Sequence, residues 1–238
     1  MKFMAMKFSL SRRLLHRCCW CGILSAVIPA CAPPDTSYFP VTPGYEWRYD
    51  ISRKTPEIRR AITQKAVVRN LPATTVDGVA YYPQLHANRK TYYFTRTEDG
   101  ISRRTPGAEE ARQVIAEPLQ VGTEWSAPSR LYLFDLPKKQ VVNWRALSRA
   151  MTLDYTITSL DERLDVPAGR FTGCLRIDAV GFLYLPRRLM LGIRIIKVEQ
   201  TQWYAPGVGL VKMTRKEYAI PNLYPSEYTQ ALIAFSGS

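Results

Sequence analysis

The fold is indicated most clearly by the stretch Tyr45-Glu-Trp-Arg-Tyr-Asp-Ile51, in which large apolar residues alternate with charged ones. Successive side chains of a β-strand point to opposite faces of the sheet, so this period of two indicates a strand buried on one face. The stretch Leu153-Asp-Tyr-Thr-Ile-Thr158 alternates in the same way. Both stretches therefore predict half-buried strands of an antiparallel sheet.

Other segments extend the β pattern along the chain. The turn signals Asp77-Gly78 and Asp99-Gly100 predict hairpins, and Pro167–Gly169 and Pro206–Gly209 predict tight turns. Further strands are predicted over 62–70, 79–86, 90–97, 130–135, 171–184, 192–204 and 209–218. Two short segments, 108–117 and 144–151, are predicted to be helical. The fold class is thus mainly β: a curved antiparallel sheet, a sandwich or a half-open β-barrel with one or two short helices.

An eight-residue pattern occurs twice, at Pro40–Trp47 and at Pro118–Trp125, with matching proline, glycine, glutamate and tryptophan. It either repeats a local device, in which a glycine turn starts a strand whose tryptophan enters the core, or marks a duplicated half-domain. The similarity ends outside the pattern, which favours the local device. In both interpretations Trp47 and Trp125 are core residues rather than ligand contacts.

The first 31 residues have the order of a bacterial lipoprotein signal. Basic residues come first, an apolar run over 18–28 follows, and Pro29-Ala30-Cys31 ends the segment. The run is too short to span a bilayer. Because Val27–Cys31 resembles a lipobox, Cys31 is predicted to carry acyl chains such as palmitate. The chain then divides into a signal peptide (1–30), a lipidated cysteine with a short tether (31–37) and a single β domain (38–238).

Two features of this signal leave alternatives open. Ordinary cleavage after Ala30-Cys31-Ala32 would leave Pro33 as the first mature residue, and translation could begin at Met4 or Met6 instead of Met1. The residue after Cys31 is Ala32, whereas an aspartate at this position would resemble an inner-membrane retention signal. The predicted location is therefore the outer membrane, lipid-anchored, on its periplasmic face.

Charge and cysteine content fit an exported domain. Removing the signal takes five of the 33 basic residues, which leaves 28 against 20 acidic ones and a formal net charge of +8. This charge suits a surface near anionic lipids, whereas nucleic acid is not an expected partner. Cys174 is the single cysteine left after Cys31, so the domain has no internal disulfide and Cys174 is expected to be buried. Four basic pairs are interpreted as solvated faces: Arg59-Arg60, Arg103-Arg104, Lys138-Lys139 and Arg187-Arg188.

No residue pattern indicates an enzyme. His86 is the single histidine beyond the signal, too few for a histidine-rich metal site, and it is interpreted as structural. No G-x-S-x-G elbow is present, and Gly207 and Gly209 lack the strand-loop-helix setting of a phosphate loop. No catalytic, cofactor-binding or metal-binding residue is predicted, and no cofactor.

Three segments carry a resemblance to a known group. Tyr38–Trp47, Val166–Ile177 and the stretch Trp203-Tyr-Ala-Pro-Gly-Val-Gly-Leu-Val-Lys212 resemble segments of uncharacterised, TapB-like bacterial envelope lipoproteins. Arg170 and Gly173 depart from the usual residues of the middle segment. The resemblance implies a largely antiparallel half-barrel similar in style to lipoprotein carriers, and it implies no established activity.

Two binding functions and one catalytic function remain open. The leading hypothesis is a non-catalytic accessory module that contacts envelope proteins or cell-wall components. The alternative is a carrier or chaperone for an acyl-bearing ligand held in a half-barrel groove. A hydrolase would need a cleft in which His86 meets a nucleophile and a carboxylate. A lip for a lipid ligand is predicted at Phe182, Tyr184, Arg187, Arg188 and Met190, although a hairpin turn at Pro186–Arg188 explains the same segment.

Overall fold

The computed structural model describes residues 35–56, 60–104, 111–132, 151–184, 195–220 and 224–237. The chain separates into two units, Met1–Pro33 and Pro34–Ser238, and the described residues all belong to the second. The predicted signal peptide and Cys31 lie outside the described residues. The described part of the second unit begins at Asp35, whose carboxylate accepts hydrogen bonds from the N–H groups of Ser37 and Val41 at 3.0 and 3.2 Å.

The second unit consists of antiparallel strands. The strands are β1 (Glu46–Lys54), β2 (Ile62–Asn70), β3 (Thr74–Val76), β4 (Val79–Leu85), β5 (Thr91–Thr97), β6 (Gly100–Arg104), β7 (Arg112–Ala116), β8 (Glu124–Ser129), β9 (Met151–Val166), β10 (Gly169–Tyr184), β11 (Ile195–Ala205), β12 (Gly209–Ile220) and β13 (Ser226–Ser236). Across the described ranges there is no helix, and hence none long and apolar enough to cross a membrane.

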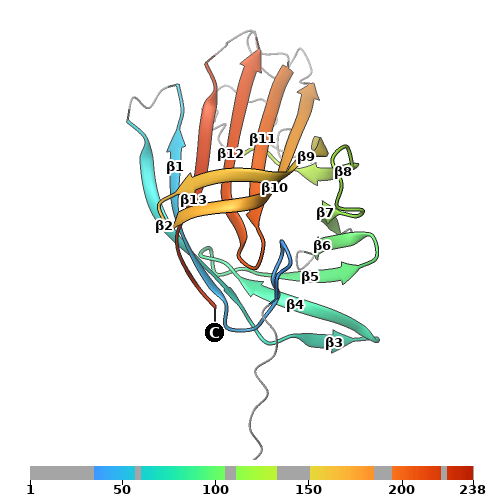
Figure 1. Ribbon diagram of the computed structural model, residues 1–238. Coiled ribbons are helices and arrows are strands. Elements are labelled where there is room, and N and C mark those ends of the chain that lie inside the picture. The colour runs from blue at the N-terminus through green and yellow to red at the C-terminus, as the bar shows by residue number, and fades with distance from the viewer. Residues whose placement is uncertain are drawn as a thin grey trace, which may run out of the picture. The chain divides into compact units, whose positions relative to one another are not determined.

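One curved sheet contains twelve of these strands in the order β7-β6-β5-β4-β2-β1-β13-β12-β11-β10-β9-β8, and β3 pairs with β4 alone. Figure 1 shows the sheet curving round until its end strands, β7 and β8, lie near each other. These two strands do not pair, so the barrel is nearly closed with one unsealed seam. The predicted fold class, a half-open antiparallel barrel, is confirmed.

The element predictions succeed where alternation is strong. β2 has the predicted bounds, and β4, β5, β10, β11 and β12 lie within a few residues of theirs. The helix predicted over 108–117 is wrong, because Arg112–Ala116 forms β7 and pairs with β6. The strand predicted over 130–135 is also wrong in its described part, where 130–132 is irregular. Residues 108–110, 133–135 and 144–150 of these predictions lie outside the described part.

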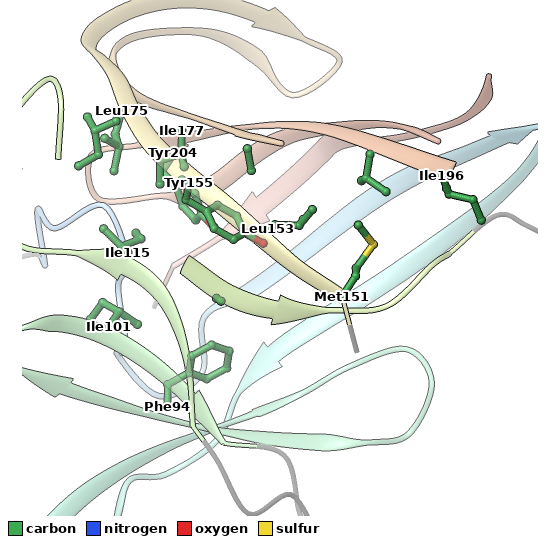
Figure 2. Packing of buried hydrophobic residues seen from close by; sticks show 14 residues of the cluster. Phe94, Ile101, Ile115, Met151, Leu153, Tyr155, Leu175, Ile177, Ile196 and Tyr204 are labelled. Carbon is green, nitrogen blue, oxygen red and sulfur yellow. The ribbon is translucent and has the colours of Figure 1, made fainter. Parts of the chain in front are cut away.

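The buried apolar side chains of the sheet form two clusters. The first joins Phe94, Ile101 and Ile115 of β5–β7 to residues of β8–β11, including Leu153 and Tyr155, as Figure 2 shows. The second gathers Trp47, Tyr49, Cys174, Leu232 and others from β1, β2, β10 and β11–β13. Cys174 is buried and unbonded to any other cysteine, as predicted, and burial, with a smaller effect of Glu162, raises its pKa to about 11.

The hairpin of β9 and β10 extends beyond the rest of the sheet. Figure 1 shows this hairpin lying across β13, and the Ala168 N–H donates to the Leu232 carbonyl at 3.0 Å. The apolar residues near its tip, including Leu164 and Phe171, pack against the second cluster. The predicted tight turn at Pro167–Gly169 is confirmed, with Gly169 at a φ of 135°.

A buried ion pair lies within β12. Arg215 Nε donates to Glu217 Oε1 at 2.8 Å, and both side chains are 0% exposed. Arg215 also donates to Gln200 Oε1 at 3.1 Å and to the Arg130 carbonyl at 2.8 Å. Glu217 Oε1 accepts the Tyr132 N–H at 2.8 Å. Every charge of this pair is thus matched by nearby polar groups, as burial requires.

Candidate functional site

The interior of the barrel contains a cavity of about 500 Å³. This volume lies in the range of small-molecule binding sites, roughly 300–1,000 Å³. Residues from β1, β2, β4–β7 and β11–β13 line it. The described lining residues are Phe39, Pro40, Trp47, Tyr49, Ile51, Arg53, Gln64, Ala66, Val68, Gln84, His86, Ala87, Asn88, Phe94, Arg103, Arg112, Val114, Tyr132, Gln200, Gln202, Tyr204, Gly209, Leu210, Met213, Tyr228 and Gln230.

Two segments that are far apart in the sequence line one part of the cavity, called the floor below: Phe39, Pro40 and Trp47 come from the first, and Gly209 and Leu210 from the second. Trp47 Nε1 donates to the Val208 carbonyl at 2.5 Å, and the Gly207 N–H donates to the Ser37 carbonyl at 2.9 Å. Tyr38 Oη donates to the Gly173 carbonyl at 3.0 Å. The three segments that carry the resemblance are therefore in contact with one another, and two of them line this floor.

The opposite end of the cavity reaches the surface, because Arg53, Gln64, Ala87 and Asn88 line it and are exposed. Trp47, Tyr49, Ile51 and Arg53 point inward in turn along β1, from the floor to this mouth. Six residues of strand at about 3.3 Å each make this wall about 20 Å long. The cavity is therefore elongated along β1, which suits an extended ligand.

Most of the wall is aromatic or aliphatic. Tyr49, Ala66, Val68, Phe94 and Met213 supply much of this surface. The polar atoms of the neighbouring tyrosines are satisfied inside the protein: Tyr49 Oη donates to the Leu210 carbonyl and Tyr228 Oη to Gln230 Oε1, both at 2.8 Å. Burial raises the pKa of Tyr228 to about 12 and that of Tyr49 further, so both are neutral hydroxyls.

Two arginines face each other on the wall nearest the seam. Arg103 of β6 lies opposite Arg112 of β7 in register, and Phe94 of β5 lies opposite Arg103 on its other side. The Arg103 guanidinium lies 4.8 Å from the centre of the Tyr92 ring. Arg112 donates to the Tyr155 hydroxyl. The Nε atoms of both arginines are buried and have no hydrogen-bond acceptor among the residues that the structure describes.

The arginine pair makes the cavity strongly positive. Among the lining residues that the structure describes, three are arginine and none is aspartate or glutamate. Burial, followed by the charge of Arg112, lowers the pKa of Arg103. For Arg112, burial lowers the pKa, but the Tyr155 and Tyr132 hydroxyls outweigh that effect and raise it. Both guanidinium groups are charged at neutral pH, since an arginine starts above 12.

His86 is packed rather than free. Its ring lies edge-on to Tyr92, with the ring centres 4.7 Å apart, and its Nε2 is 2.9 Å from Gln84 Oε1. Because Gln84 Nε2 donates to Asn70 Oδ1 at 3.0 Å, Gln84 Oε1 must accept, which assigns the hydrogen of His86 to Nε2. Burial, and then the charge of Arg103, lower the pKa of His86 to about 4. The ring is thus neutral at pH 7 and acts as a hydrogen-bond donor.

The two predicted lip residues that the structure describes do not line this cavity. Phe182 and Tyr184 lie on β10, are 47% and 72% exposed, and are not among the lining residues. Arg187, Arg188 and Met190 lie outside the described residues, as does the lipidation site Cys31, so the lip and the lipidation stay predictions. Trp47 and Trp125 are packed in the core as expected, yet Trp47 also lines the cavity.

The arginine pair was not found from the sequence. Arg103-Arg104 was interpreted as a solvated pair, which is correct for Arg104, whereas Arg103 points inward. The signal was available, because Asp99-Gly100 starts a strand in which Ile101 and Arg103 share a face. Arg112 lies in the segment 108–117, and the helix predicted there does not place it opposite Arg103.

Within the described ranges, no group of three or more histidine, cysteine, aspartate or glutamate side chains is placed to hold a metal ion. The described lining residues offer hydrogen-bond donors, positive charge and apolar surface. This arrangement can bind an elongated ligand, and His86 has no carboxylate among its hydrogen-bond partners.

No protein-family model matches the sequence. No curated protein matches it either. Two solved structures are similar in fold. One is a Bacteroides fragilis protein described as exported and as having a YmcC-like fold, with 15% identity, a TM-score of 0.38, and coverage of 84% of this chain and 98% of the other. The second is a Parabacteroides distasonis protein described as a lipoprotein, with 16% identity, a TM-score of 0.41, and coverage of 84% and 99%. The resemblance to TapB-like lipoproteins stays a prediction.

Proposed function

We propose that this protein is a non-catalytic binding module, lipid-anchored through Cys31 at the periplasmic face of the outer membrane, that carries an acyl-bearing ligand in its barrel. The observation that supports the proposal best is the elongated interior cavity of about 500 Å³ between the floor and the exposed mouth. A sheet with a filled interior would have favoured an accessory module that works through its outer surface alone.

The lining favours an acyl chain over a compact polar ligand. The wall along β1 and β2 presents Trp47, Tyr49, Ile51, Ala66 and Val68, and each of these side chains is buried. Covering such a surface with an alkyl chain is favourable by about 0.8 kcal/mol for each buried CH₂ group. The two inward-facing arginines of the adjacent strands β6 and β7 add a local positive charge to this wall, as a binding site for an amphiphile requires.

Native mass spectrometry tests the proposal. The exported chain carrying Cys31→Ser, which removes the acylated residue, is purified without detergent and measured directly. We expect a bound mass in the range of a lipid, and we expect the purified protein to enhance the fluorescence of dansyl-undecanoic acid. A ligand-free mass together with no fluorescence change would overturn the carrier and leave the accessory module.

A matched pair of variants on β2 ties binding to the cavity. Ala66 is buried and lines the cavity, whereas Val67 is 41% exposed and is not among the lining residues. Ala66→Phe should fill part of the cavity and abolish binding, while Val67→Phe should leave it unchanged. Equal binding by both variants would place the ligand elsewhere. Circular dichroism of each variant confirms that the sheet is intact.

A further inference from the structure

We propose that Arg103 and Arg112 form the binding site for the anionic head group of the ligand, a carboxylate or phosphate, while the apolar part lies along the cavity. This inference rests on the proposed function, because it assigns the class of ligand for the same cavity. The site is a pair of guanidinium groups on adjacent strands, bordered by Tyr92 and Tyr155.

The pairing of the two strands brings the charges together. Residues directly opposite in an antiparallel pair have Cβ atoms about 4.5–5.5 Å apart, and like charges in that position are destabilising. A second positive charge beside the first therefore needs a compensating group. An anion between the two guanidinium groups would supply it and would be held by charge-assisted hydrogen bonds.

Arg215 of the same barrel has a carboxylate partner that Arg103 and Arg112 lack among the described residues. Arg215 is buried against Glu217 with N–O separation of 2.8 Å. Arg103 and Arg112 form no ion pair with any carboxylate of the part of the chain that the structure describes. Their Nε atoms are buried and find no acceptor within the described ranges. Buried charges in native proteins are normally paired, so two guanidinium groups that line one cavity without a described carboxylate partner point to an anionic ligand.

The surroundings select a single compact anion attached to an apolar chain. Arginine presents a planar fork of donors that matches the two oxygens of a carboxylate or the three of a phosphate. Phe94 borders Arg103 on the inner face, and the apolar wall of β1 and β2 shares the cavity. Fatty acids and single-chain lipid phosphates both combine these two features.

Three probes that share one alkyl chain separate the head-group chemistries: dodecyl phosphate, dodecanoate and dodecanol. Each is titrated, below its micelle concentration, into the unacylated Cys31→Ser chain by displacement of a fluorescent fatty acid. We expect at least one anionic probe to bind about tenfold or more tightly than dodecanol. Preference for dodecyl phosphate alone assigns a phosphate head group, and preference for dodecanoate alone assigns a carboxylate.

Variants at three arginines assign the effect to residues. Arg103→Gln and Arg112→Gln should each remove the preference for the anionic probe and leave the affinity for dodecanol unchanged. Arg104→Gln is the matched control, because Arg104 is the next residue of β6 and is exposed on the outer face. Arg103→Lys should retain part of the preference, since it keeps the charge but loses the fork.

The outcomes separate failure of the head-group site from failure of the carrier. Equal affinity of all three probes, or an equal effect of Arg103→Gln and Arg104→Gln, would overturn the head-group site and leave the carrier in place. Absence of binding by every probe, dodecanol included, would overturn the carrier and the head-group site together. Circular dichroism of Arg103→Gln and Arg112→Gln confirms the fold, and either variant alone suffices for the test.

Discussion

Arg103 lies directly opposite Arg112 across the β6–β7 pair, and both side chains face the interior of the barrel. Two like charges in register oppose folding, so they place a cost on the empty protein that a bound anion would relieve. Residues that serve binding at the expense of stability are a common feature of functional sites. Removal of one arginine of this pair should therefore change the free energy of unfolding differently from removal of a structural arginine.

Replacing Arg103 should not destabilise the empty protein. Arg103→Gln removes a partly buried charge and its repulsion from Arg112, which offsets the loss of its contact with Tyr92. We expect the free energy of unfolding to stay within about 0.5 kcal/mol of the wild-type value or to rise. Urea denaturation followed by circular dichroism measures this. A loss of 2 kcal/mol or more would make Arg103 a structural residue.

Arg215 should behave in the opposite way. Arg215→Met leaves the fully buried Glu217 carboxylate without its guanidinium partner. Breaking a buried pair on one side costs about 3–5 kcal/mol, so the variant should unfold at a much lower urea concentration. The double variant Arg215→Met, Glu217→Leu should recover part of this loss, because no charge is then left unpaired. Recovery stays incomplete, since Glu217 also accepts the Tyr132 N–H. A single-variant loss below 1 kcal/mol would contradict the prediction.

Acid should weaken the fold partly through His86. Its pKa in the folded protein is about 4, below the ordinary value of 6.5, so the unfolded chain binds more protons between these pH values. Stability from this residue is complete above about pH 6.5 and falls as the pH drops towards 4, by about 3 kcal/mol in total. Three groups surround the ring. The charge of Arg103 lowers the pKa of His86, Gln84 accepts a hydrogen bond from the neutral ring, and Tyr92 packs against it.

The variant His86→Gln isolates this contribution. Urea denaturation of both proteins at pH 7 and at pH 4.5 gives the loss of stability in each, and the variant should lose less. The carboxylates Asp35 and Glu199, whose pKa values are lowered in the fold, destabilise both proteins equally on acidification. An identical loss in wild type and variant would show that His86 does not titrate in this way.

Strong local patterns made much of the barrel predictable. The alternation in 45–51 and 153–158 and the glycine turns at Asp77-Gly78 and Asp99-Gly100 act over a few residues, and the structure confirms them. β6 and β7 have five residues each, too short for periodicity to decide between strand and helix. Their conformation is set by pairing with each other and with β5.

The cavity could not be predicted, because it depends on how strands distant in the sequence enclose a volume. Trp47 has the pattern of a core residue, and it is buried, but only the closed barrel shows that one side of its ring faces open space. The contacts at the floor could not be predicted from the sequence for the same reason. Tyr38, Gly173 and Val208 belong to three separate motifs of the resemblance, and the contacts of Tyr38 with Gly173 and of Trp47 with Val208 form only in the folded chain.

A substitution at Gly209 tests whether its contact with Pro40 holds the floor of the cavity in place. It has a φ of 88°, and a Cβ atom there would lie 3.3 Å from Cδ of Pro40 and 3.8 Å from Nε1 of Trp47. Gly209→Ala should therefore cost the left-handed strain of about 1 kcal/mol and a further amount for displacing Pro40. Gly78→Ala is the matched control: Gly78 has a φ of 78°, and its Cβ would meet nothing within 4 Å. We expect Gly209→Ala to be less stable than Gly78→Ala by about 1 kcal/mol in urea denaturation, and to bind the fluorescent fatty acid more weakly because the floor shifts. Equal stability and equal binding of the two variants would show that the contact of Gly209 with Pro40 does not hold the floor in place.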